Sequence, residues 1–159
     1  MIIYSQRWSS IIHKVYSYDK IGGTMTENLQ IRRDLTKDLL QRLAHPDEDV
    51  REAAVEALAM NASDEDWRAD ELISQQGINL IIELLDEDNA HIVSSALDII
   101  IAVAGTGDQE VLLTHGVIEI LYRLEDMDDG VIRKKAHEAL WLLEPGVEDV
   151  VTAKPHNGY

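Results

Sequence analysis

The sequence predicts an all-α protein built as a solenoid of stacked helical repeats. Apolar residues recur with helical spacing, prolines and glycines separate the apolar stretches, and the whole pattern recurs about every 40 residues. No stretch alternates apolar and polar residues as an amphipathic strand does. With 159 residues, 45 % of them hydrophobic, the chain is long enough for one domain with an aliphatic core.

The first expected helix begins near Thr26, and leucines form its apolar stripe: Leu35, Leu39, Leu40 and Leu43. Pro46 ends this helix, because proline cannot continue the hydrogen-bond ladder. A second apolar stripe runs over residues 50–58. Ser63 lies three residues before Asp66, which is the spacing of an N-cap, so a further helix is expected to begin there.

Glycines and an isoleucine-rich run characterise the later helices. Gly77 and Gly116 are typical of C-terminal helix stops, where glycine adopts the left-handed conformation without strain. Residues 99–101 are three isoleucines, which favour a strand by propensity. They lie inside the helical-period run 92–104, so we expect a buried helix instead.

Self-comparison identifies about three repeats and the first helix of a fourth. Residues 77–85 match residues 116–124, and residues 107–112 match residues 146–151, both at a shift of 39. One longer helix recurs three times, with apolar residues at Val50, Ala54, Ala57 and Leu58, at Ile92, Ala96, Ile99 and Ile100, and at Ile132, Ala136, Ala139 and Leu140. Such a unit cannot bury its apolar face alone, so stacked neighbours must build the core.

The first 24 residues differ in charge from the rest. They carry a net charge of +2, whereas residues 25–159 carry −18. We expect residues 1–25 to form an N-terminal arm, either disordered or the product of a start codon placed too far upstream, and a real cap over the first repeat is the alternative. The repeat domain is expected over residues 26–153 and a tail over residues 154–159.

Composition excludes several classes of protein. The chain has no cysteine, which excludes disulfides, thiolate metal sites and thiol nucleophiles. With 14 basic and 30 acidic residues, its net charge of −16 argues against binding the phosphate backbone of nucleic acid. No apolar run approaches the ~20 residues that span a bilayer, and no secretory signal is evident, so the expected location is the cytoplasm.

The repeats resemble those of the armadillo family and the related HEAT family. Residues 108–121 are similar to the first and second helices of an armadillo repeat, and residues 92–104 and 132–143 to its long third helix. The turn at residues 46–51 is closer to a HEAT repeat. The resemblance covers about residues 35–153 and implies a right-handed superhelix of about three armadillo/HEAT-like repeats, whose third helices line a concave groove.

The chain departs from the peptide-binding members of that family. Importin-α and β-catenin carry an asparagine ladder on their third helices, and the importins have a tryptophan one turn earlier. The matching asparagine positions here are Met60, Ala102 and Leu142. The resemblance therefore does not imply that asparagine amides clamp an extended peptide backbone.

The positions that match the tryptophans hold one carboxylate in each repeat: Glu56, Asp98 and Glu138. If the third helices stack as the resemblance implies, these residues form an acidic row along the groove, either a track for lysine and arginine side chains or simply a solvated face. Glu52 adds a like charge one turn before Glu56, and Lys134 is spaced to pair with Glu138. Ser94 leaves Asp98 free, so Glu56 and Asp98 are expected to contribute most.

A second acidic row, at residues 47–49, 86–88 and 125–129, falls between the second and third helices of the repeats. We interpret these residues as turn and helix-cap residues, since the spacing of a calcium-binding EF-hand loop is absent. Trp67 and Trp141 are the tryptophans of the repeats. Packing in the core or at the end of the stack is the favoured interpretation, and for Trp141 the alternative is a place near the groove.

The predicted function is a non-catalytic protein–protein interaction module, a scaffold or adaptor, that presents an acidic concave surface to a basic partner segment. The expected partner-binding residues are Glu56, Asp98, Glu138, Glu52 and Trp141. Neither a catalytic motif nor a cofactor or metal site is recognised, because the histidines lack ligand spacing and no phosphate-binding glycine loop occurs.

Two other functions stay open. One is a nucleotide-exchange-type cofactor that acts on a chaperone. The other is a HEAT-like enzyme subunit such as a bilin lyase. A DNA glycosylase on the same scaffold needs a basic, aromatic face that this chain lacks. The ends of a repeat stack also offer apolar surface for self-association.

Overall fold

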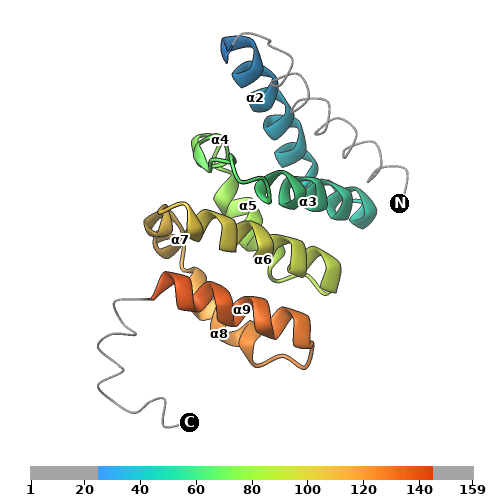
Figure 1. Cartoon of the computed structure of the whole chain (residues 1–159). Helices are drawn as coiled ribbons and strands as arrows, with labels where there is room; N and C mark the ends of the chain where they lie inside the picture. The colour runs from blue at the N-terminus through green and yellow to red at the C-terminus, as the bar shows by residue number, and fades with distance from the viewer. Residues whose placement is uncertain (1–24, 145–159) are drawn as a thin grey trace.

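The computed structural model describes residues 25–144, and every regular element in that part of the chain is a helix (Figure 1). With the numbering of Figure 1, the helices are α2 (Met25–Arg42), α3 (Glu48–Ala62), α4 (Asp70–Ser74), α5 (Gly77–Leu84), α6 (Ala90–Gly105), α7 (Gln109–Thr114), α8 (Val117–Glu125) and α9 (Gly130–Leu143). The predicted all-α fold is confirmed. The predictions for the N-terminal arm, the fourth-repeat helix and the tail lie outside the described residues.

The helices form a right-handed solenoid of about three repeats. Helices α4 to α6 and α7 to α9 make two three-helix repeats, and α2 with α3 makes the first. The long third helices α3, α6 and α9 pack side by side with α6 in the middle (Figure 1). Because α5 packs on α6 and α8 packs on α9, the shorter helices cover one side of this layer, and within residues 25–144 they leave the other side open.

The core is aliphatic and runs without interruption through the stack. Leu39, Ile81, Ile92 and Leu121 are each no more than 1 % exposed, and all belong to one cluster of buried side chains. The isoleucine run lies within α6, where Ile99 and Ile100 are buried, so the buried helix predicted there is confirmed. Neighbouring repeats thus supply the burial that one repeat cannot provide.

Each third helix begins with a side-chain cap. Asp47 accepts a hydrogen bond from the backbone of Asp49, and Asn89 and Asp129 cap α6 and α9 in the same way. The prediction that Ser63 caps a following helix is wrong. Its backbone amide and hydroxyl bond back to the last turn of α3, the hydroxyl at 2.6 Å from the Met60 carbonyl, and α4 begins only at Asp70.

Gly116 and Gly77 are glycines for different reasons. Gly116 lies between α7 and α8 with φ of +70°, as predicted for a helix stop. At Gly77 the prediction of a left-handed stop is wrong, because Gln76 takes that conformation, with φ of +59°. Gly77 instead begins α5, where a β-carbon would lie 2.7 Å from methyl groups of both Leu40 and Leu72.

The outer side of α9 is polar. Three positions that are buried in α6 hold polar residues in α9 or at its C-cap: Val93, Leu97 and Ala104 correspond to Arg133, His137 and Glu144. His137 pairs with Glu125, and Glu144 accepts a hydrogen bond of 2.8 Å from the Tyr122 hydroxyl. These polar residues distinguish α9 from α6, which is buried in the middle of the layer.

Candidate functional site

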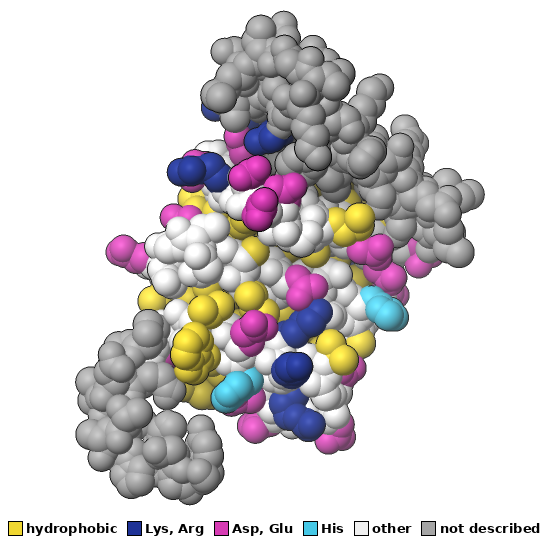
Figure 2. Space-filling model, viewed as in Figure 1, with side chains coloured by type: hydrophobic (Ala, Val, Ile, Leu, Met, Phe, Trp, Pro, Cys, Tyr) yellow, Lys and Arg dark blue, Asp and Glu magenta, His cyan; other side chains and the backbone are white. Residues whose placement is uncertain are grey.

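The open side of the third helices carries nine aligned side chains, which we call the third-helix face. It consists of Glu56, Ala59 and Met60 on α3, Asp98, Ile101 and Ala102 on α6, and Glu138, Trp141 and Leu142 on α9. All nine are partly or fully exposed, and Figure 2 views the molecule from the side of α3, α6 and α9, where acidic and hydrophobic side chains lie next to each other. Each helix therefore presents a carboxylate followed, one turn later, by apolar residues.

The middle carboxylate, Asp98, is already paired. The ammonium of Lys135 on α9 lies 2.9 Å from Asp98 Oδ1 and 2.7 Å from Ser94 Oγ on α6. The expectation that Asp98 stays free is therefore wrong. The residues of α6 alone do not reveal this pair, because the lysine belongs to the next repeat, 37 residues later.

Glu138 is the exposed carboxylate of the face. Within residues 25–144 it makes neither an ion pair nor a hydrogen bond, so the expected pair with Lys134 does not form. Lys134 and Arg133 are both exposed, on the first turns of the same helix. Glu56, at the equivalent position of α3, is only partly exposed.

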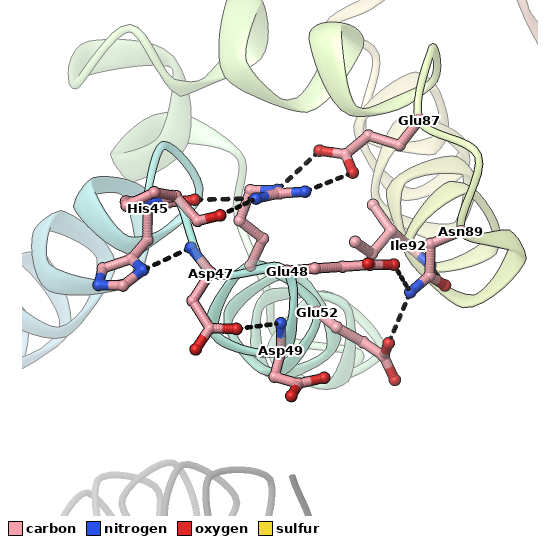
Figure 3. A network of polar contacts seen from close by, with 10 residues as sticks. His45, Asp47, Glu48, Asp49, Glu52, Glu87, Asn89 and Ile92 are labelled. Atoms are coloured by element: carbon pink, nitrogen blue, oxygen red, sulfur yellow. Dashed lines mark hydrogen bonds and ion pairs between the residues drawn. The ribbon is translucent and has the colours of Figure 1, made fainter.

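Glu52 faces the neighbouring repeat. Asn89 donates from Nδ2 to Glu52 at 2.8 Å and to Glu48 at 2.6 Å (Figure 3). Its Oδ1 caps α6 by accepting hydrogen bonds from the amides of His91 and Ile92. Asn89 thus caps the N-terminus of α6 and also donates hydrogen bonds to two carboxylates of α3. Glu52 therefore belongs to the contact between α3 and α6, beside the expected acidic row.

The acidic turns also join one repeat to the next. Arg51 on α3 makes a bidentate pair with Glu87 at 2.8 and 2.9 Å and donates to the carbonyls of His45 and Pro46 (Figure 3). The hydrogen bond to Glu87 raises the pKa of Arg51 above its ordinary value.

Arg123 on α8 pairs with Asp86 in the same turn as Glu87. The interpretation of these rows as turn and cap residues is confirmed for Asp47 and Asp129. The ion pairs across repeats are additional, and the sequence pattern did not reveal them.

The two tryptophans have different environments. Trp67 is partly buried and packs against the core, as the favoured interpretation held. Trp141 is 64 % exposed, so for this residue packing in the core is wrong. It lies three residues after Glu138 on α9, close enough for the two side chains to contact the same ligand group.

A cavity of about 100 Å³ lies apart from the third-helix face, between α2, α3, α4 and α6. Its lining includes the core residues Leu58, Leu72 and Ile99, and the partly buried Trp67. Ligand pockets usually measure roughly 300–1,000 Å³. This cavity is therefore smaller than a usual ligand pocket.

Metal-binding clusters and membrane-spanning helices are both absent from the part of the chain that the structure describes. No group of three or more histidine, aspartate or glutamate side chains is arranged to hold a metal ion there. None of the described helices is long and apolar enough to cross a membrane.

No protein-family model and no curated protein matches the chain. Solved structures do match. A computationally designed armadillo repeat protein for modular peptide recognition has a TM-score of 0.71 and 20 % identity, over 89 % of this chain and 58 % of its own length. A designed armadillo repeat protein in complex with the peptide (KR)4 has a TM-score of 0.66 and 23 % identity, over 74 % of this chain and 51 % of its own.

An engineered protein with 26 % identity and a TM-score of 0.67 matches over 76 % of this chain and 52 % of its own. The chain thus spans about half the length of these structures. At this level of identity the likeness concerns the fold, and it agrees with the helix order and with the layer of long third helices described above. The chain is a short α-solenoid of the armadillo-repeat fold.

Proposed function

We propose that this chain is a non-catalytic interaction module whose third-helix face binds a basic segment of a partner protein. The observation that carries the proposal is the recurrence of one arrangement on three packed helices. Each third helix has a carboxylate at the same position, with apolar side chains one turn later.

Lysine and arginine side chains fit this arrangement, because they combine an apolar stem with a charged head. The stem can lie on the apolar residues, such as Ile101 and Leu142, while the head reaches the carboxylate one turn away. The net charge of −16 supports faster encounter with a basic segment. The armadillo-fold neighbour in complex with (KR)4 shows that a designed protein with this fold accommodates a basic peptide.

The three carboxylates contribute unequally. Asp98 is neutralised by Lys135, and we therefore assign a larger contribution to Glu138. Each exposed pair with a basic side chain is worth at most about 1 kcal/mol, so a single contact binds weakly. Affinity must come from several contacts along the face.

The test is a titration with fluorescein-labelled (KR)4, followed by anisotropy at low and moderate salt. The double variant Glu56→Gln/Glu138→Gln should bind about tenfold more weakly than the unmodified protein and with a shallower salt dependence. The control is Glu83→Gln/Glu119→Gln, which removes the same charge from exposed positions of α5 and α8. Equal losses in the two double variants would contradict a specific role of the third-helix face.

A further inference from the structure

The outer side of α9 carries its positive and negative charges at opposite ends. Arg133 lies near the N-terminus of the helix and Glu144 at its C-cap, with His137 and Trp141 on the turns between them. The helical spacing places these four residues in one row, which we call the α9 outer stripe. We propose that this stripe is a dimerisation surface, on which α9 of a second copy of this chain packs antiparallel across a twofold axis.

The stripe is complementary to itself, as a twofold interface requires. In an antiparallel pair of α9 helices, Arg133 of each copy lies opposite Glu144 of the other, and His137 lies opposite Trp141. The midpoint between residues 133 and 144 and the midpoint between residues 137 and 141 agree to within half a residue, or about 0.8 Å along the helix. One register therefore satisfies all four residues. A parallel pair would place like charges together.

Arg133 is prepared for a carboxylate from a neighbouring helix layer. Its equivalent on α3, Arg51, donates to the carbonyl of His45 at 3.0 Å and binds Glu87 of the next repeat at 2.8 and 2.9 Å. Arg133 donates in the same way to the carbonyl of Met127, at 3.4 Å, but no carboxylate within residues 25–144 binds it. The described part of the chain thus provides one half of an ion pair whose other half a second copy supplies.

Helix α8 positions the other members of the stripe. The Tyr122 hydroxyl donates to Glu144 Oε1 at 2.8 Å, and Glu144 Oε2 has no donor among the described residues. His137 Nδ1 lies 2.5 Å from Glu125 Oε2. Both side chains are therefore held in place before a second copy arrives, which lowers the conformational entropy lost on association.

The distribution of charge favours α9 over the other third helices as a contact between copies. Two chains with a net charge of −16 repel each other. This repulsion is weakest at α9, which has three basic residues and one acidic residue, whereas α3 has one basic and four acidic residues. Trp141 is 64 % exposed and adds apolar area at the centre of the contact.

The experiment measures self-association of the full chain by sedimentation velocity, from about 10 µM to about 1 mM. The unmodified chain should change from monomer to dimer as its concentration rises. Arg133→Glu and Glu144→Arg should each weaken the dimer about tenfold or more, because each variant places like charges opposite each other at two points. An equimolar mixture of the two variants should restore a heterodimer, since both opposed pairs then join an arginine to a glutamate.

The matched controls are Lys37→Glu and Glu119→Arg, which make the same charge changes at exposed positions of α2 and α8. Each should dimerise as the unmodified chain does to within about twofold, and mixing them should add nothing. Circular dichroism verifies that all variants are folded, and restoration by mixing verifies it independently for Arg133→Glu and Glu144→Arg.

Three results would overturn the proposal. They are a chain that stays monomeric throughout the concentration range, a dimer that Arg133→Glu and Glu144→Arg leave intact, and a weakened dimer that the mixture does not restore. The inference goes beyond the proposed function, because Arg133 and Glu144 lie outside the third-helix face. Failure of the dimer therefore leaves the binding of a basic segment to be judged by its own titration.

Discussion

Lys135 on α9 and Asp98 on α6 form an ion pair of 2.9 Å across two repeats, at the centre of the layer of third helices. Both side chains are only partly exposed, at 26 % and 45 %. The pair makes the carboxylates of the face unequal, because the charge of Asp98 is neutralised while Glu138 stays exposed and unpaired among residues 25–144. It therefore acts against a partner that places a cation opposite α6.

The first prediction follows from this pair. Lys135→Ala should raise the affinity for (KR)4, because it releases Asp98 for the peptide, and the expected gain is about three- to fivefold. Lys134→Ala is the matched control, since it removes the same charge from an exposed neighbour that has no partner among the described residues. Equal gains in the two variants, measured by anisotropy at one salt concentration, would show that only net charge matters.

A second prediction concerns Asn89. Asn89→Asp keeps the cap of α6 but places a third carboxylate against Glu48 and Glu52, so it should lower the free energy of unfolding by about 1–2 kcal/mol. Asp129→Asn, at the equivalent cap of α9, should change it by less than about 0.5 kcal/mol. Urea unfolding at low and high salt measures both variants, and the deficit of Asn89→Asp should shrink as salt screens the repulsion. An equal loss in the free energy of unfolding of Asp129→Asn would show that the effect comes from capping alone.

The third prediction distinguishes a steric requirement at Gly77 from a backbone requirement at Gln76, in the turn before α5. Gly77→Ala should destabilise the fold by about 1–3 kcal/mol, because the added methyl group overlaps Leu40 and Leu72. Gln76→Gly should be neutral or stabilising, since it relieves the left-handed residue. Gly105→Ala is the control: nothing lies within 4 Å of its β-carbon, so no loss of stability is expected. A harmless Gly77→Ala in thermal melts would contradict the close approach of these helices.

The fourth prediction concerns the bidentate pair of Arg51 and Glu87. Both side chains are about one-fifth exposed, so a double-mutant cycle with Arg51→Ala and Glu87→Ala should give a coupling free energy of about 1 kcal/mol. The pKa of Arg51 is raised in the folded state, so this contribution is complete below the ordinary arginine pKa and is lost only as pH rises through the folded-state value. Loss of the arginine charge should therefore play no part in the stability profile near neutral pH. A coupling of zero in urea unfolding would show that the pair is only incidental.

Helical periodicity was sufficient to predict the fold, because burial fixes which residues of each helix are apolar. Ile99 and Ile100 illustrate this, since the period of the surrounding run outweighed their preference for strands. Gly116 was also predictable, because a left-handed residue between two helices favours glycine.

Several of the errors concern relations between helices. Lys135 reaches Asp98 and Asn89 reaches Glu52 over 37 residues of sequence, and such pairs depend on how far side chains extend once the helices have packed. Gly77 was misinterpreted for the same reason, since the methyl groups of Leu40 and Leu72 that approach it belong to other helices. The alignment of the repeats with one another predicted which residues form the acidic row. Only the packed structure shows which of these carboxylates already have a partner.

The most direct test of the account is to locate the peptide on the protein. A titration of the ¹⁵N-labelled chain with (KR)4, followed by heteronuclear NMR, reports the environment of each backbone amide and of the Trp141 indole. We predict that the largest shift changes occur on α3 and α9 around Glu56, Glu138 and Trp141, with smaller changes near Asp98. Changes concentrated instead at the acidic turns 47–49, 86–88 and 125–129 would contradict the assignment of the third-helix face as the binding surface.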